Sequence, residues 1–188
     1  MRFEESPLPG VWVIELEPLD DERGWFARSF DRDEFAARGM AGEVAQCNLA
    51  FTARADTLRG MHYQAAPHGE SKLVRCMRGA TYHVALDLRA DSPTYRGWHG
   101  VQLRPDSLRA LYLPAGVAHG SQTLVDDCLV FYQMGCRHVP AAARGVRWDD
   151  PAFAIEWPEV AGGGERLISP RDASFADWQE VGEMSRAG

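Results

Sequence analysis

The sequence predicts an all-β domain in which short strands form a sandwich or a barrel. Short apolar runs recur along the chain and are separated by Gly, Pro, Asp or Ser. The clearest alternation is in residues 81–88, where one face is apolar and the other is polar. The apolar face carries Tyr82, Val84, Leu86 and Leu88, and the polar face carries His83, Asp87 and Arg89. The chain has 188 residues, which suffices for one hydrophobic core and is too short for two comfortable ones.

Further strands are expected where other apolar runs end at turn residues. These are residues 11–16, 25–30, 73–77, 109–113 and 129–134. One helix should begin at Asp31, which can cap it, with Glu34 as capping-box partner, and should end at Gly39. A second short helix is expected within residues 169–180. The glycine run at 161–164 predicts a flexible connection before a C-terminal arm from about residue 160, so that residues 1–188 form a single domain.

The composition argues against several classes of protein. The formal net charge is −7, whereas a nucleic-acid surface would be basic. The first residues show no basic region followed by an apolar run, and no stretch of about 18 apolar residues occurs. We therefore expect neither a signal peptide nor a membrane partner. The four cysteines form no C-x-x-C pair, which favours reduced thiols in a cytoplasmic protein.

The densest group of reactive side chains contains Arg59, His62, Gln64 and Lys72. In a strand His62 and Gln64 point the same way, and a bulge at Gly60 would bring Arg59 to that side as well. Histidine titrates near neutrality and can act as a general base. Lys72 is the only lysine among 20 basic residues, which indicates a need for a compact charge that could hold a developing enolate. The alternative is a packed or surface histidine and a solvated lysine.

A second motif, P-x-G-x-x-H, ends at His119 and is typical of a cupin barrel, where it delivers a histidine to the start of a strand. Iron, manganese and zinc sites need three or more converging ligands. His83 stands alone on its strand, and no histidine pair has metal-ligand spacing. We therefore expect no metal, and a metal-dependent cupin is the weaker alternative.

Two further side chains are suited to proton transfer. Tyr132 lies among apolar residues and could protonate a carbanion from the face opposite a base. Its alternative is a core aromatic whose hydroxyl finds a partner. Asp172, in the sequence S-P-R-D, could orient His62 as carboxylates often orient a catalytic imidazole. Its alternative is a helix N-terminus or a surface turn.

Taken together, these motifs resemble the dTDP-4-dehydrorhamnose 3,5-epimerase family of the cupin superfamily. The resemblance runs from about residue 10 to about residue 175. The matching segments are R-G-W-F at 23–26, R-G-M-H-Y-Q at 59–64, K-L-V at 72–74, V-A-L-D-L-R-A-D-S-P-T at 84–94, P-A-G-V-A-H-G at 114–120, Tyr132, W-D-D-P at 148–151, I-E-W-P at 155–158 and S-P-R-D at 169–172.

The resemblance implies a cupin-type jelly-roll β-barrel, a homodimer, and an enzyme that uses neither a metal nor another cofactor. It also implies epimerisation at carbons 3 and 5, or at one of them, of a nucleotide-linked 4-keto-6-deoxyhexose. His62 would be the base and Asp172 its orienting partner. Lys72 would steady the enolate, and Tyr132 would return a proton from the opposite face.

The resemblance further implies a set of substrate-binding residues. Arg23, Arg59 and His119 match positions that hold the nucleotide diphosphate and the sugar. Other substrate contacts are expected from Phe26, Gln46, Asn48, Gln64, His138 and Arg171.

The chain departs from the family pattern at several positions. Arg28 and Ala143 stand where glutamate is common, Cys47 and His83 where aspartate is usual, and His138 where many members have a tyrosine that stacks on thymine. The expected partner is therefore a dTDP- or CDP-4-keto-6-deoxyglucose type of substrate, with the nucleobase left open. The alternatives are a related cupin 3,4-ketoisomerase, a metal-dependent cupin and a catalytically silent sugar-binding cupin.

Overall fold

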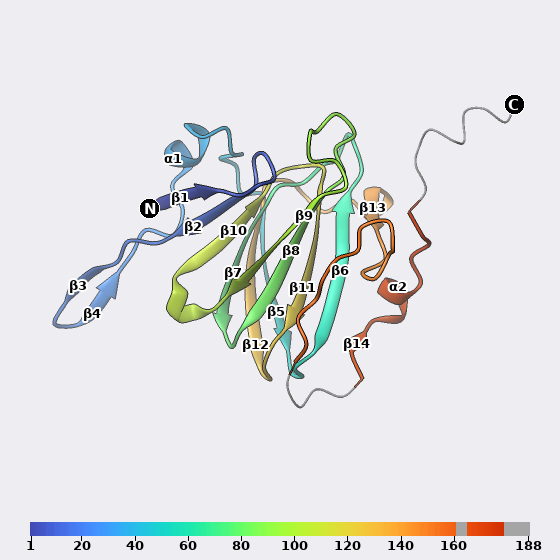
Figure 1. The fold of residues 1–188 in the computed structure, drawn as a ribbon. Coiled ribbons are helices and arrows are strands. Elements are labelled where there is room, and N and C mark those ends of the chain that lie inside the picture. Colours follow the sequence, from blue (N-terminus) through green and yellow to red (C-terminus); the bar gives the residue numbers. More distant parts are fainter. Residues whose placement is uncertain (161–164, 179–188) are drawn as a thin grey trace, which may run out of the picture.

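The computed structural model describes residues 1–160 and 165–178, and in it two mostly antiparallel sheets face each other (Figure 1). The first sheet has the order β1 (Arg2–Glu5), β2 (Trp12–Glu15), β10 (Arg109–Leu113), β7 (Lys72–Arg78), β12 (Cys128–Met134) and β5 (Gln46–Thr52). The second has the order β13 (Ala143–Gly145), β6 (Thr57–Gln64), β11 (Val117–Thr123), β8 (Thr81–Asp87) and β9 (Trp98–Leu103), with β14 (Leu167–Ile168) parallel to β6. A separate hairpin joins β3 (Leu19–Asp21) to β4 (Gly24–Phe26).

The prediction of an all-β jelly roll is confirmed, although the two sheets keep open edges and do not close into a barrel. Aliphatic side chains from both sheets fill the space between them. Members of this core from five different strands are Val74, Ala85, Leu111, Val117 and Val130. Burying such side chains is the main stabilising term, at about 1.5–3 kcal/mol for each one that is fully buried.

The strands expected from apolar runs are present as β2, β7, β8, β10 and β12. The strand expected at 25–30 is shorter than predicted, since β4 (Gly24–Phe26) ends at Phe26. Beyond that residue the chain leaves the hairpin, and the carbonyl of Ser29 accepts a hydrogen bond from the buried Arg75. Packing against β7 therefore overrides the local strand preference.

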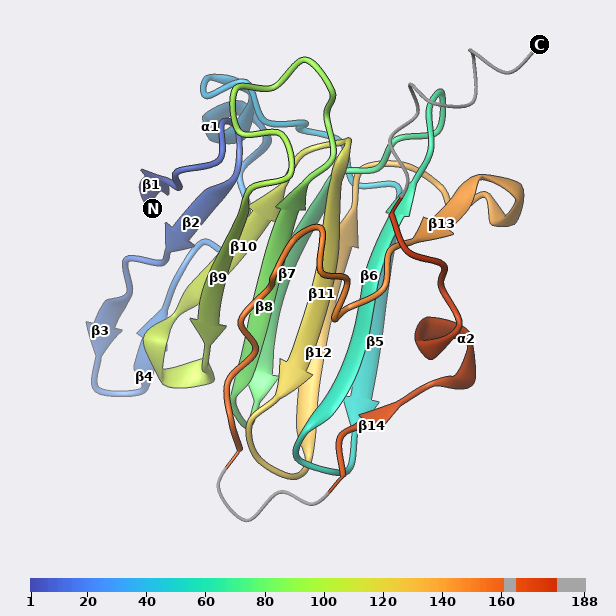
Figure 2. The same cartoon turned by 45° about the vertical axis from the view of Figure 1, so that its right-hand side comes forward.

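The polar face of β8 points into the molecule. On its apolar face, Val84 and Leu86 pack beneath Phe153 and Trp157. These aromatic residues belong to the segment that follows β13, which crosses the outside of the second sheet (Figure 2). With that side covered, β8 directs His83 between the sheets, where the side chain is fully buried.

A β-bulge in β6 decides which side chains reach the interior. The pairing of β6 with β11 shifts register between the His119–His62 pair and the Ser121–Arg59 pair, so that β6 contains one extra residue. Gly60 occupies the bulge with φ +122°, and a Cβ there would lie 2.6 Å from the Cα of Gly120. The bulge expected at Gly60 is therefore present, and only glycine fits it.

Two short helices flank the sheets. Helix α1 (Arg32–Ala36) begins after Asp31, whose side chain accepts hydrogen bonds from the backbone N–H groups of Asp33 and Glu34. Gly39 follows it with φ +73°, as expected for a helix end. Helix α2 (Pro170–Ala173) lies within the predicted range 169–180, of which residues 179–180 lie outside the described residues. The expected connection at 161–164 also lies outside them.

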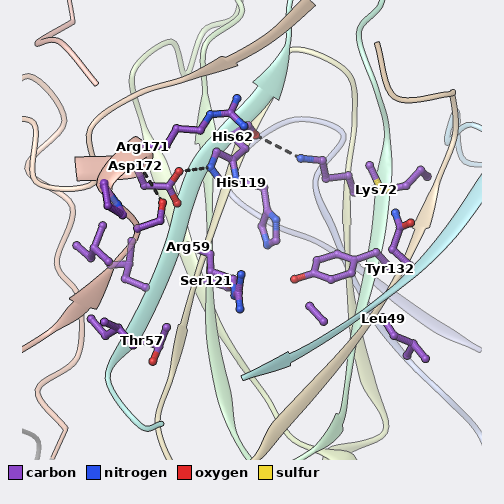
Figure 3. Close-up of a pocket in the computed structure, with 18 residues that line it drawn as sticks. Leu49, Thr57, Arg59, His62, Lys72, His119, Ser121, Tyr132, Arg171 and Asp172 are labelled. Atoms are coloured by element: carbon purple, nitrogen blue, oxygen red, sulfur yellow. Dashed lines mark hydrogen bonds and ion pairs between the residues drawn. The ribbon is translucent and has the colours of Figure 1, made fainter. Parts of the chain in front are cut away.

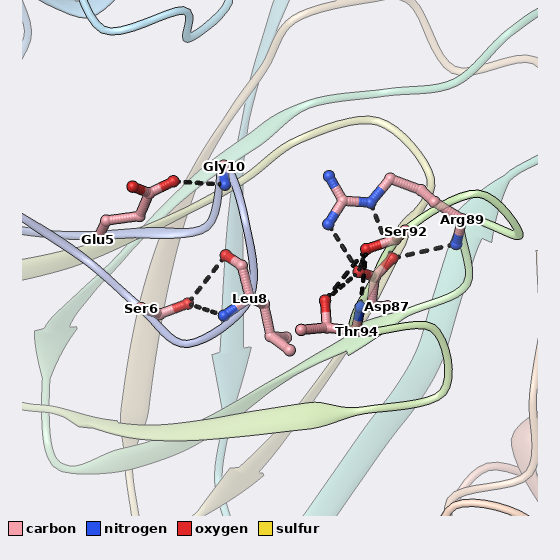
Figure 4. A network of polar contacts seen from close by, with 8 residues as sticks. All are labelled: Glu5, Ser6, Leu8, Gly10, Asp87, Arg89, Ser92 and Thr94. Atoms are coloured by element: carbon pink, nitrogen blue, oxygen red, sulfur yellow. Dashed lines mark hydrogen bonds and ion pairs between the residues drawn. The ribbon is translucent and has the colours of Figure 1, made fainter.

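The loop after β8 is held by one buried carboxylate. Asp87 accepts hydrogen bonds from the backbone and guanidinium of Arg89 and from the hydroxyls of Ser92 and Thr94 (Figure 4). The D-L-R-x-x-S-P-T motif is therefore a structural clamp at the end of the sheet. No helix within the described ranges has the length and apolar character needed to cross a membrane.

Candidate active site

A cavity of about 690 Å³ opens between the two sheets and collects most of the predicted site residues (Figure 3). Its wall contains all four of the predicted catalytic residues. They are His62 from β6, Lys72 from β7, Tyr132 from β12 and Asp172 from α2. Four predicted substrate-binding residues also line it, namely Asn48, Arg59, His119 and Arg171.

His62 and Asp172 form a hydrogen-bonded pair with 2.8 Å between Nε2 and Oδ1. The other carboxylate oxygen of Asp172 accepts from the backbone N–H of Gly60 at 3.0 Å. Burial opposes ionisation of Asp172, but the hydrogen bonds from His62 and Gly60 outweigh it and lower the pKa of the carboxyl group. An ionised carboxylate only accepts hydrogen bonds, so Nε2 of His62 carries the proton. This leaves Nδ1 as the ring nitrogen that can take a proton.

The helix that carries Asp172 is built for this contact. Ser169 caps α2 and accepts from the backbone N–H of Asp172, which fixes the start of the helix beside β6. Strand β14 hydrogen-bonds to β6 just before it. The C-terminal arm is thereby attached to the strand that holds His62, although the two residues of the pair are 110 positions apart.

Lys72 is buried and paired. Its Nζ lies 2.8 Å from Oε1 of Glu70, both side chains are at most 9% exposed, and it also donates to the carbonyl of His62 at 3.3 Å. The ammonium group is thus fixed beside the base. Sequence reasoning missed Glu70, although residues two apart in an extended chain point the same way and a buried lysine needs a carboxylate.

Tyr132 lies in the sheet opposite His62. Figure 3 shows its phenol entering the cavity from the far side. Burial raises the pKa of Tyr132, while nearby Arg59 and a hydrogen bond with Ser121 partly counter the rise. The phenol therefore stays protonated at neutral pH and can donate a proton.

A second cavity of about 370 Å³ continues from the first and shares His62, Lys72 and Arg171 with it. Gln46 and His138 line it, and the side-chain carbonyl of Gln46 accepts from the backbone N–H of His138 at 2.6 Å.

Gln64 also lines the second cavity, but its amide is already engaged. It accepts from the backbone N–H of Val139 and donates to the carbonyls of His68 and Arg137. The side-chain amide of Gln64 therefore links two loops, and its hydrogen-bonding groups are already occupied by the protein.

Two predicted binding residues lie elsewhere. Arg23 and Phe26 are in the β3–β4 hairpin, which projects away from the sheets (Figure 1), and neither lines the cavities around His62. Arg23 forms an ion pair with Asp21, and Phe26 is 66% exposed.

Within residues 1–160 and 165–178, no three or more His, Cys, Asp and Glu side chains are grouped so that they could hold a metal ion. His62 and His119 are instead engaged by Asp172 and His83, respectively.

Comparison with known proteins assigns the family. The sequence model of the family described as dTDP-4-dehydrorhamnose 3,5-epimerase matches residues 5–180. The chain belongs to this family. Epimerases of this family are isomerases, and the predictions of family and enzyme class are confirmed.

Individual epimerases support the same assignment. A dTDP-4-dehydrorhamnose 3,5-epimerase of Methanothermobacter thermautotrophicus is 38% identical over 95% of this chain and 95% of that protein. A dTDP-4-dehydrorhamnose 3-epimerase of Streptomyces niveus is 40% identical over 92% and 81% of the two chains. The crystal structure of the 3,5-epimerase of Bacillus anthracis, with TDP and PPi bound, superposes with a TM-score of 0.87 at 33% identity, covering 94% and 99%.

Proposed function

We propose that this epimerase inverts carbons 3 and 5, or one of them, of a nucleotide-linked 4-keto-6-deoxyhexose. The observation that carries the proposal is the placement of His62 and Tyr132 in opposite sheets around one cavity, with Lys72 beside the base. Inversion of a carbon centre requires removal of a proton from one face and its return to the other. The substrates named for the related proteins support the choice of sugar nucleotide.

The reaction follows from the acidity of hydrogens beside a ketone. Nδ1 of His62 removes the proton from the carbon next to the carbonyl group, and the electron pair becomes the enolate. The ammonium group of Lys72 stabilises the negative oxygen. Tyr132 then gives its phenolic proton to the carbon from the opposite face. Solvent takes the proton from His62 and restores the one on Tyr132, so each turn exchanges substrate hydrogen with water.

The nucleotide is proposed to be dTDP or CDP. The TDP bound to the Bacillus anthracis relative supports a pyrimidine diphosphate. Arg59 and Arg171 line the same cavity as His62 and are suited to the phosphate oxygens. His138 and Ala143 line the adjoining cavity. Because His138 stands where many members have a tyrosine that stacks on thymine, the proposal leaves the nucleobase open.

We also propose a homodimer in which the hairpin of one copy reaches the site of the other. The support is that neither Arg23 nor Phe26 lines the cavities around His62 of its own chain. The hairpin exposes Trp25 and Phe26, and the edge strand β5 beside the cavity exposes Leu49 and Phe51. Apolar side chains on an open sheet edge favour association. Light scattering on Phe26→Asp tests this proposal, since a dimeric mass equal to that of the wild type would contradict it.

A cytoplasmic location is proposed as well. All four cysteines are free thiols, and exposed Cys47 has no disulfide partner. Free thiols are usual in reducing compartments.

The decisive experiment is incubation with dTDP- and CDP-4-keto-6-deoxyglucose in heavy water, followed by NMR. We expect deuterium at carbons 3 and 5, or at one of them, with one of the two nucleotides. His62→Ala should abolish exchange, and Tyr132→Phe should allow abstraction but impair inversion. His99→Ala and Tyr82→Phe, whose side chains lie outside the cavity, serve as matched controls.

Two outcomes would overturn the proposal. The first is the absence of exchange with both nucleotides, which would leave a silent sugar-binding protein. The second is a product whose ketone has moved to carbon 3, which would identify a 3,4-ketoisomerase. Exchange in His62→Ala at the wild-type rate would disprove the assignment of the base.

A further inference from the structure

A chain of three side chains leads from the interior of β8 to the cavity. Nδ1 of His83 lies 3.0 Å from Nε2 of His119, and Nε2 of His83 lies 2.9 Å from Oγ1 of Thr81. The two imidazole rings are nearly parallel, with an interplanar angle of 3°. His83 is fully buried, and His119 is 6% exposed and lines the cavity.

The surroundings of the two rings disfavour positive charge. Burial lowers the pKa of His83 to about 3. Burial also lowers the pKa of His119, and so do the neighbouring His83, Lys72 and His62. The groups facing His119 from the packed strands are His62 on β6, Lys72 on β7, His83 on β8 and Tyr132 on β12. No carboxylate in the described residues forms a hydrogen bond with either ring.

Two arrangements of protons satisfy the contacts of an uncharged pair. In one, the hydroxyl of Thr81 donates to His83, and Nδ1–H of His83 donates to Nε2 of His119. Nδ1 of His119 then carries a proton. In the other, every bond is reversed, and Nδ1 of His119 is bare. Within the described residues Nδ1 of His119 forms no hydrogen bond, and Figure 3 shows the ring between His62 and Tyr132.

The ligand decides between the two arrangements. The oxygens of the sugar, and above all an enolate oxygen, need hydrogen-bond donors, and a bare Nδ1 would repel them. We propose that Thr81 and His83 form an uncharged relay that holds His119 as the Nδ1–H tautomer, so that His119 donates a hydrogen bond to an oxygen of the bound sugar. His83 is thus a positioning residue that acts through His119. The choice of tautomer rests on the proposed function for its ligand, whereas the hydrogen-bonded, uncharged pair of His83 and His119 does not.

An imidazole at position 83 and a carboxylate at the same position would impose different tautomers on His119. A carboxylate in place of His83 would only accept, so Nε2 of His119 would have to carry the proton. Nδ1 would then be a donor only when the ring is charged. His83→Asp should therefore make activity depend on protonation of His119, whereas the wild type has no such dependence. His83→Gln keeps an N–H donor for His119 and should preserve the relay.

The test is NMR of the full-length protein labelled with 15N-histidine, together with pH profiles of the epimerase. We expect His119 of the wild type to be the Nδ1–H tautomer and not to titrate between about pH 5 and pH 9. Thr81→Val should mix the two tautomers, and His99→Gln should change no signal of His119. The kcat of His83→Asp should fall more than about tenfold at high pH and recover as pH falls, while that of His83→Gln stays within about tenfold of wild type.

The readouts separate the two proposals. If the wild type were inactive on both sugar nucleotides while His119 was still the Nδ1–H tautomer, the function would be wrong and the relay right. A wild-type His119 that titrates near neutrality, or that is the Nε2–H tautomer, would overturn the relay. So would a His83→Asp variant with the wild-type pH profile. If His83→Asp did not fold, the tautomer of His119 in Thr81→Val and His83→Gln would decide the matter.

Discussion

Substitution of Asp172 by asparagine would alter one proton in the site while keeping its shape. In the wild type the two carboxylate oxygens accept from Nε2 of His62 and from the backbone N–H of Gly60. An asparagine has only one oxygen to offer. The backbone N–H of Gly60 can only donate, so it will take that oxygen, and the amide NH₂ will face His62. Nε2 of His62 must then lose its proton, which moves to Nδ1.

The size of the effect follows from the loss of the base. A protonated Nδ1 cannot accept a proton from the sugar, so catalysis is limited to the rare tautomer. General bases contribute about 10²–10⁴ in rate, and we expect kcat to fall about 10³-fold, which corresponds to about 4 kcal/mol. The amide keeps both hydrogen bonds, so the free energy of unfolding should fall by only about 1 kcal/mol. The binding of dTDP should be nearly unchanged.

The assay combines deuterium exchange with 15N NMR of the His62 ring. Asp150→Asn is the matched control, because Asp150 is also buried and accepts from the backbone N–H groups of Ala152 and Trp178, away from the cavity. It should lose stability without losing kcat. An Asp172→Asn enzyme that keeps more than about a tenth of the wild-type rate, or whose His62 still carries its proton on Nε2, would refute the reasoning.

Four further predictions concern binding, stability and metal dependence. Arg59→Ala should raise the Kd for dTDP more than about tenfold by calorimetry, whereas exposed Arg78→Ala should not; a small change would move the phosphate site elsewhere. Glu70→Gln breaks a buried ion pair and should lower the free energy of unfolding in urea by about 3 kcal/mol, unlike exposed Glu43→Gln. Burial opposes ionisation of Asp87, but hydrogen bonds from Arg89, Ser92 and Thr94 lower its pKa to about 2. Its folded-state pKa is below the unfolded value, so about 2 kcal/mol of stability is present above pH 4 and should disappear as pH falls towards about 2 in the wild type but not in Asp87→Asn. Activity should survive dialysis against EDTA, and its loss with recovery on added metal would favour the metal-dependent alternative.

The alternation of apolar and polar residues, together with the turn residues, predicted where most strands lie, because both signals are present in short stretches of sequence. They could not predict which face of β8 is inside. Val84 and Leu86 are covered by Phe153 and Trp157, which come from far along the sequence. The polar face is therefore free to turn inward, and that placement brings His83 to the cavity.

The bulge at Gly60 could be predicted from the sequence, since a glycine inside a strand weakens it and often marks a bulge. The convergence of His62 and Asp172 could not be derived from spacing, because they are 110 residues apart. The chemistry of a carboxylate and an imidazole suggested it, and the resemblance implied it. The pairing of Lys72 with Glu70 could have been predicted from the sequence, because residues two positions apart in an extended chain point the same way. The contact of His83 with His119 depends on the pairing of β8 with β11 and could not be predicted from the sequence.

The charges of the cavity explain why an uncharged His119 suits the proposed reaction. Lys72 is balanced by Glu70, and neutral His62 beside ionised Asp172 leaves one negative charge. Arg59 and Arg171 bring two positive charges, which match the two of a bound diphosphate. When His62 takes a proton and the enolate forms, the net charge does not change, and Lys72 and the new imidazolium are already present to stabilise the anion. A charged His119 would add a cation without a partner and would compete with proton uptake by His62. A hydrogen bond from a neutral ring assists the enolate without that penalty.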